Sequence, residues 1–310
     1  MLLGRYILRR LLYMIPMLFL VILLVFLIMS FTPGDPATNN LPLTATREVK
    51  DAYNASVGYS DSLGVRFGTY LKGLLHGNVL SYTSGQNIFE ELGRRLPLTL
   101  RLGLVSFAIA AVLGVSLGIL SAIKQYSFLD TSLTILAVLF ASIPSFFVAI
   151  CLLLYFSVYR GILPTFGVND GIKSYILPVV TLVAGSIPVL SRMTRSAMLG
   201  VLQQDYIRTA RSKGVPEKSV IWKHALKNAS FPIITLLLGG VANVLGGSVI
   251  AESIFSLPGI GTYMLKAINE KNVPGVMTCA LILSAVFMLA MVCIDICFAL
   301  IDPKVKARYQ

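Results

Sequence analysis

The chain has 310 residues, of which 56% are hydrophobic and only 13% are charged, and its mean hydropathy is +0.80. This composition is too apolar for a soluble domain, and the chain is too long for one span, so it predicts a polytopic membrane protein. The formal net charge is +12, but the basic residues flank apolar runs and form no stripe with interleaved aromatic residues. This placement favours anchoring beside a membrane over a nucleic-acid partner.

Six apolar stretches are long enough for the roughly 20 residues that a helix needs to cross a bilayer core. The predicted spans are residues 11–34, 102–123, 131–159, 174–191, 228–251 and 272–294. The first is interpreted as an uncleaved span, because its apolar core is too long for a signal peptide and no A-x-A cleavage site follows it. Six spans place both termini on the same side of the membrane.

The positive charges predict which side is cytoplasmic. Residues 192–227 hold eight Lys or Arg against two acids, and the tail adds Lys304, Lys306 and Arg308. The opposite loops, 160–173 and 252–271, hold only two basic residues each. Because short cytoplasmic loops are enriched in Lys and Arg, we expect both termini and residues 192–227 to be cytoplasmic.

These spans imply a linear division of the chain. We expect an amino end and first span at 1–34, an external segment at 35–96, a five-helix transmembrane domain at 97–301 that includes the loop 192–227, and a cytoplasmic tail at 302–310. Within the external segment, "VRFGTYLKGLLHG" predicts one amphipathic helix. His76 is interpreted as a solvated loop residue, since no second His or Cys lies near it in sequence.

The spans carry small residues and prolines. Gly114 and Gly118 lie four residues apart, a spacing that lets helix backbones approach closely. Pro144, Pro178 and Pro188 are expected to interrupt hydrogen-bond ladders. Kinked, closely packed helices suit a bundle that moves, although a static bundle shows the same features. Further glycines lie on the fifth span, at Gly239, Gly240, Gly246 and Gly247.

Chemistry-bearing groups are sparse in the sequence. The four cysteines lie within apolar runs without a C-x-x-C pair, so we interpret them as small packing residues. Asp295 is interpreted as an interfacial carboxylate. Midplane carboxylates, which an ion-coupled transporter usually needs, are almost absent, and no P-loop motif occurs. No metal site or nucleophile–base motif of an enzyme is predicted.

The stretch "DYIRTARSKGVPEKSVIWKHAL", residues 205–226, is too structured for an idle connection. Gly214 fits a helix C-terminus, and Pro216 fits the first turn of a second helix. Val220, Ile221 and Ala225 give that second helix an apolar side. The pattern predicts a rigid helix–turn–helix presented to a cytoplasmic partner. The alternative is a basic connection that rests on anionic lipid.

The segment "YIRTARSKG…HALKNASFPIIT" resembles the cytoplasmic-loop signature of bacterial ABC importer permeases, in which a small residue, here Ala210, precedes a glycine by four. "FTPGDPA", "RRLPLTLRLG", "GGSVIAESIFSLPGIGTYMLKAI" and "DPKVKARYQ" resemble the dipeptide/oligopeptide/nickel branch, and specifically its first permease subunit. The resemblance covers nearly the whole chain, from about Arg9 to Arg308. Ser212, Asn272 and "GNVL" at 77–80 depart from the common pattern of the branch.

The resemblance implies an all-α type I ABC importer permease fold with six transmembrane helices in a bacterial cytoplasmic membrane. The implied partners are a second, similar permease, two cytoplasmic ATPases, an external substrate-binding protein and membrane lipid. This chain would bind no cofactor and catalyse nothing, while the ATPases hold ATP and Mg²⁺. The expected ATPase-coupling residues are Tyr206, Arg208, Ala210, Arg211, Lys213, Gly214, Val215, Pro216 and His224.

The cargo implied by the resemblance is di- or oligopeptides, with nickel, nickel chelates or glutathione as alternatives for the same type of importer. An ion-coupled secondary transporter is a more distant alternative. Arg208, Arg211 and Lys213 are expected to pair either with acidic groups of an ATPase or with lipid headgroups, and both roles stay open.

Overall fold

The computed structural model describes residues 2–301, without the side chains of residues 2–7, 238, 241–245, 295 and 297–301. The predicted tail and the side chains of Asp295 and Cys297 therefore lie outside the described residues. The described chain is helical, and its β structure is limited to one isolated bridge between Leu80 and Asn87. It forms two compact units: a terminal unit up to Thr99 and from Pro258 onward, and a central unit, Leu100–Leu257.

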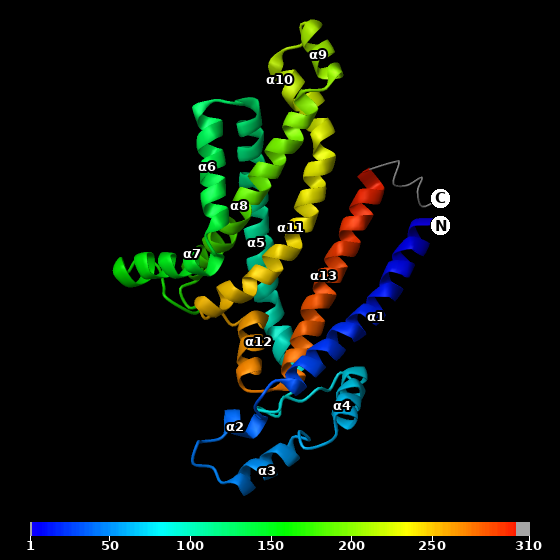
Figure 1. Ribbon diagram of the computed structural model, residues 1–310, viewed down its shortest axis with the longest axis vertical. Helices are drawn as coiled ribbons and strands as arrows, with labels where there is room; N and C mark the ends of the chain where they lie inside the picture. Colours follow the sequence, from blue (N-terminus) through cyan, green and yellow to red (C-terminus); the bar gives the residue numbers. More distant parts are fainter. Residues whose placement is uncertain (1, 302–310) are drawn as a thin grey trace. The chain divides into compact units, whose positions relative to one another are not determined.

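The terminal unit is built on α1 (Leu2–Phe31), α12 (Ile260–Asn269) and α13 (Val273–Ile301), with the first turns of α5 (Ile88–Ile123) (Figure 1). Helix α13 packs against α1 and α12. The unit's core includes Ile22, Phe26, Tyr70, Leu92, Ile260 and Met277. The predicted first and sixth spans thus correspond to two helices of one unit.

The external segment contains α2 (Pro36–Asn40), α3 (Arg47–Ser56) and α4 (Leu63–Leu75). Helix α4 confirms the predicted amphipathic helix, because Tyr70 on one face is buried in the core of the terminal unit. Asn272 fixes the following loop: its Nδ2 donates to Ser81 Oγ at 2.7 Å, and its Oδ1 accepts from the Tyr82 amide at 3.2 Å. An aspartate at this position would have no N–H group to donate to Ser81.

The central unit contains the rest of α5, α6 (Phe128–Ser142), α7 (Ser145–Leu152), the π-helix η1 (Leu153–Tyr159), α8 (Lys173–Leu202) and α11 (Leu226–Ile254). Helix α8 packs against α6, α7 and α11. It also lies very close to α5, because a Cβ added at Gly118 would lie 2.5 Å from the Ser191 carbonyl oxygen, and one at Gly114 would lie 2.7 Å from Leu190 Cβ. The predicted close approach at these two glycines is confirmed.

The prolines behave in two ways. Pro144 lies in the break between α6 and α7, where the predicted third span bends by 95°. Pro178 and Pro188 instead lie inside the continuous helix α8, where each removes one N–H donor without ending the helix. The expectation of an interrupted span therefore holds fully only at Pro144.

Four described helices are long and apolar enough to cross a membrane, and five qualify if the bent pair counts as one span. They include α5 and α8, which are longer than predicted: residues 88–96 already belong to α5, and residues 192–202 continue α8. The predicted fifth span falls on α11, part of whose side chains lie outside the described residues. The number of six stays a prediction.

Candidate functional site

The predicted cytoplasmic loop forms a helix–turn–helix. It comprises α9 (Asp205–Ser212) and the short α10 (Glu217–Ser219), which continues through the π-helix η2 (Val220–Ala225) into α11. Figure 1 shows α9 and α10 at the end of α8 and α11, at the same end of the central unit as the turn between α5 and α6. We call residues 203–225 the coupling loop, after the role that the sequence resemblance implies.

The turn of the coupling loop depends on Gly214, whose φ is +74°. The Gly214 amide donates to Arg211 O at 3.0 Å, and the Val215 amide donates to Ala210 O at 3.2 Å. This pair of bonds is a Schellman motif, which needs a left-handed residue after the helix. A Cβ at Gly214 would meet nothing within 4 Å, so in this chain the backbone conformation requires glycine, not a lack of space.

An apolar underside attaches the coupling loop to the transmembrane helices. Ile207 of α9 and Val220 of η2 are fully buried, and they pack with Met198 of α8 and Ile119 of α5 in one cluster. Burying one such side chain stabilises by about 1.5–3 kcal/mol. The predicted apolar side of the second helix is confirmed, because Val220, Ile221 and Ala225 are all buried.

Arg211 and Glu217 form an ion pair across the turn. Arg211 Nε donates to Glu217 Oε2 at 3.1 Å, and Nη2 donates to Oε1 at 2.7 Å. These hydrogen bonds from Arg211 hold the pKa of the Glu217 carboxyl below its ordinary value, and those to Glu217 raise the pKa of Arg211. Arg211 thus has a partner within its own chain, which the sequence reading had not foreseen.

The remaining predicted residues differ in exposure. Tyr206, Arg208, Lys213 and Pro216 are exposed, and Arg208 lies 3.9 Å from Asp205. Ala210, Val215 and His224 are half-buried. Pro216 directly precedes α10 instead of lying inside its first turn. The structure places all nine residues on this one loop.

Trp222 is an exposed aromatic residue of the coupling loop that the sequence reading did not single out. It is the single tryptophan of the chain, and 54% of its surface is exposed. Exposed aromatic residues are typical anchors of protein interfaces. Its presence in a polar loop was the signal that could have identified it.

An ion pair between α6 and α8, whose carboxylate is buried, was also missed by the sequence analysis. Asp130, in the first turn of α6, accepts hydrogen bonds from Arg195 of α8 at 2.6 and 2.7 Å, from the Tyr126 amide at 2.9 Å and from the Ser121 hydroxyl. Tyr126 has a φ of +62°. The carboxylate therefore ties the α5–α6 turn to α8. The sequence analysis had counted Arg195 among the basic residues of 192–227 and had given Asp130 no role.

The cysteines and the candidate metal ligands form no cluster among the described residues. Cys151, Cys279 and Cys293 are free thiols. No group of three or more His, Cys, Asp or Glu that could hold a metal ion occurs among the described residues.

Comparisons with known proteins agree with this architecture. The family "Binding-protein-dependent transport system inner membrane component" matches residues 114–307, and the corresponding amino-terminal family matches residues 1–103. The chain is 37% identical to a putative peptide transport system permease protein of Brucella abortus (strain 2308), over 97% of this chain and 98% of that protein. It is 34% identical to the dipeptide transport system permease protein DppB of Alkalihalophilus pseudofirmus, over 97% and 99% respectively.

A solved structure supports the fold alone. An inward-facing form of the MetNI methionine ABC transporter superposes with a TM-score of 0.57 at 19% identity, over 68% of this chain and 96% of that one. The family matches, the apolar helices and this likeness lead to one conclusion. The chain belongs to the binding-protein-dependent transport system inner membrane component family, as a multi-pass membrane protein with the all-α fold of type I ABC importer permeases.

Proposed function

We propose that this chain forms part of the translocation pathway for di- and oligopeptides and that its coupling loop transmits the work of cytoplasmic ATPases. Relatives that are 33–37% identical are named as peptide permeases, which supports the cargo. The observation that carries the proposal is the structure of the coupling loop. Its turn is spanned by the Arg211–Glu217 ion pair, and its underside packs on buried apolar residues.

The coupling loop suits a mechanical role because it is attached at both ends and along its underside. It connects α8 and α11 directly, and Ile207 is buried against Met198 and Ile119. A force on the exposed surface therefore moves these helices with the loop, since packed interiors transmit displacement and resist compression. ATP-driven closure of two ATPases would push on the loop and move the spans between inward-open and outward-open states.

The partners follow from the same proposal. The ATPases hold ATP and Mg²⁺, and this chain pairs with a second, similar permease. The coupling loop and both termini face the cytoplasm, where Lys and Arg are concentrated. A binding protein delivers the cargo to the external segment. Arg208 and Lys213 are exposed on the coupling loop and accessible to acidic groups of an ATPase or to lipid headgroups.

The test is uptake of radiolabelled dialanine by proteoliposomes that contain the full complex and its binding protein. We expect uptake that requires ATP and is insensitive to an uncoupler. Uptake that persists without ATP and stops with the uncoupler would contradict the proposal and identify an ion-coupled transporter. ATP-driven uptake of a nickel chelate or glutathione, with no dialanine uptake, would overturn the peptide cargo alone.

A further inference from the structure

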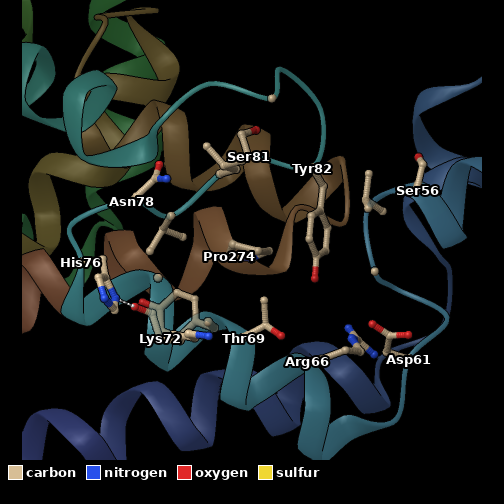
Figure 2. A pocket seen from close by; sticks show the side chains of 17 residues that line it. Ser56, Asp61, Arg66, Thr69, Lys72, His76, Asn78, Ser81, Tyr82 and Pro274 are labelled. Carbon is tan, nitrogen blue, oxygen red and sulfur yellow. Dashed lines mark hydrogen bonds between the residues drawn. The ribbon is translucent and has the colours of Figure 1, made fainter.

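The terminal unit contains a cavity of about 620 Å³ on its external segment. It is bounded by the polar face of α4, the turn before it, the loop at residues 78–85 and Pro274 at the start of α13 (Figure 2). This volume is in the range of roughly 300–1,000 Å³ typical of sites for small molecules. The coupling loop belongs to the other unit, so this cavity has no part in the site described above.

Arg66 of α4 lines this cavity and is buried, with only 9% of its surface exposed. Its guanidinium lies 4.1 Å from the centre of the Tyr59 ring, which fixes the orientation of the group. Within the described chain, Nε and Nη2 are buried and have no hydrogen-bond partner. A buried N–H donor without an acceptor costs desolvation free energy. An acceptor from outside the chain would therefore stabilise this edge of the guanidinium.

The same edge of the guanidinium binds carboxylates elsewhere in this molecule. Arg195 uses Nε and Nη2 on Asp130, and Arg211 uses Nε and Nη2 on Glu217. These two N–H groups form a planar fork that matches the two oxygens of a carboxylate. In Arg66 the fork is present and unoccupied by any residue of the described chain.

The charges around Arg66 favour an anion. Lys271 is 2% exposed, and burial, together with the charge of Arg66, lowers its pKa. Lys271 does not line the cavity itself; Lys72 is the second cation of the cavity wall beside Arg66, whereas Asp61 contributes a carboxylate that is exposed. Figure 2 shows Asp61 and Arg66 at one end of the cavity. The cations outnumber the carboxylate, so the site attracts negative charge.

The other end of the cavity offers polar groups without a second acid. Figure 2 shows His76 and Asn78 there, whereas Tyr82 lies on the Arg66 side of the cavity with its hydroxyl towards Arg66. Burial raises the pKa of Tyr82, and a hydrogen bond with the Arg66 side chain offsets this only in part, so the hydroxyl stays protonated near neutral pH. A ligand with one carboxylate and further hydrogen-bonding groups matches this distribution.

We infer that this cavity binds a small carboxylate-bearing ligand, whose carboxylate accepts hydrogen bonds from Nε and Nη2 of Arg66. That the ligand is a short peptide with a free C-terminus rests on the proposed function. The cavity would then hold cargo at the external face, before the transmembrane pathway.

The test measures binding to the intact complex of both permeases and ATPases in lipid nanodiscs, without the binding protein. The probes for calorimetric titration are dialanine, dialanine amide and inorganic phosphate. We expect dialanine to bind, and the amide to bind at least tenfold more weakly because it lacks the carboxylate that Arg66 receives. Phosphate or the amide binding as tightly as dialanine would overturn the inference.

Two variants address the cavity by different routes. Arg66→Met removes the fork and should weaken dialanine binding about tenfold or more. Thr69→Trp fills the cavity from the exposed face of α4 and leaves Arg66 in place, with the same expected loss. Arg47→Met is the matched control, since Arg47 lies on the same external segment, is 95% exposed and does not line the cavity. Thermal unfolding confirms that each variant is folded.

The outcomes separate this inference from the proposed function. Unchanged dialanine binding in folded Thr69→Trp would overturn the inference. It would also be overturned if Arg66→Met left dialanine binding unchanged and weakened only the association of the complex with the binding protein. In the latter case Arg66 would serve an acidic side chain of that partner. ATP-driven dialanine uptake by a complex that binds no dialanine here would overturn the inference and leave the function standing. Dialanine binding in this cavity without any ATP-driven uptake would leave the inference standing and contradict the proposed function.

Discussion

Arg195 and Asp130 form a two-point ion pair that joins α8 to the start of α6, with Nε–Oδ1 and Nη2–Oδ2 distances of 2.6 and 2.7 Å. The Asp130 side chain is buried, and the pair lies two turns before the end of α8. Met198, one turn further along α8, is part of the buried cluster that holds the coupling loop. The pair therefore supports the part of α8 on which the coupling loop is seated.

Removing one partner of this pair should destabilise the protein strongly. Asp130→Asn leaves the half-buried Arg195 guanidinium without its counter-ion and weakens its charge-assisted hydrogen bonds, which is expected to cost about 1.5–3 kcal/mol. Thermal unfolding of the detergent-solubilised chain measures this loss. The double variant with Arg195→Gln should recover part of the stability, because it leaves no uncompensated charge.

Asp205→Asn is the matched control for that experiment. The Asp205 side chain is 98% exposed and lies 3.9 Å from Arg208, so its ion pair should contribute less than about 1 kcal/mol. Equal losses of stability in the Asp130 and Asp205 variants would show that the buried pair has no special structural role.

The Arg211–Glu217 pair predicts a pH dependence of the coupling loop. Arg211 lowers the pKa of Glu217 from its ordinary 4.5, so the pair stabilises the loop above that pH. This stability is lost as the pH falls through the lowered pKa. Both side chains are about half exposed, with relative areas of 43% and 56%, so the effect should be at most about 1 kcal/mol.

Trp222 provides the measurement, since it is the single tryptophan and lies in the coupling loop. Its fluorescence should stay constant from neutral pH down to the ordinary pKa of Glu217 and change below it. Glu217→Gln should remove this acid transition and show the loosened state already at neutral pH. An identical acid transition in Glu217→Gln would exclude Glu217 as its source.

Gly118 should tolerate no side chain, because its Cβ would lie 2.5 Å from Ser191 O and 2.6 Å from Thr194 Cβ. Gly118→Ala is expected to force α5 away from α8 and to cost about 1–3 kcal/mol in thermal unfolding. Gly93→Ala is the control on the same helix, where an added Cβ meets nothing within 4 Å. That control should be neutral or slightly stabilising. A neutral Gly118→Ala would contradict the close approach of the two helices.

Much of this architecture could be predicted from the sequence, because apolar length, glycine spacing and turn residues are local signals. Gly214 and its helix–turn–helix, the amphipathic α4 and the approach at Gly118 are examples. Pro144 also marked a break, although the 95° bend depends on packing that no local pattern contains.

What the sequence could not predict are pairings between distant residues. Asp130 and Arg195 are 65 positions apart, and a charge at the edge of an apolar run reads equally well as solvated or paired. The unpaired donors of Arg66 likewise depend on how α4 packs against Tyr59 and the loop at residues 78–85, which no local sequence pattern contains. The predicted ends of α5 and α8 were wrong for a related reason. Both helices continue past the apolar run and include charged residues.

The central claim is that the turn at Gly214 transmits ATPase work to the transmembrane helices. The most direct test measures dialanine transported per ATP hydrolysed in proteoliposomes, for the wild type, Gly214→Val and Gly161→Val. Both glycines have positive φ, +74° and +62°, and open space around the missing Cβ, so both substitutions impose similar backbone strain. We predict that Gly214→Val assembles in the membrane but loses coupled transport, while Gly161→Val retains it. Wild-type coupling in Gly214→Val would contradict the account.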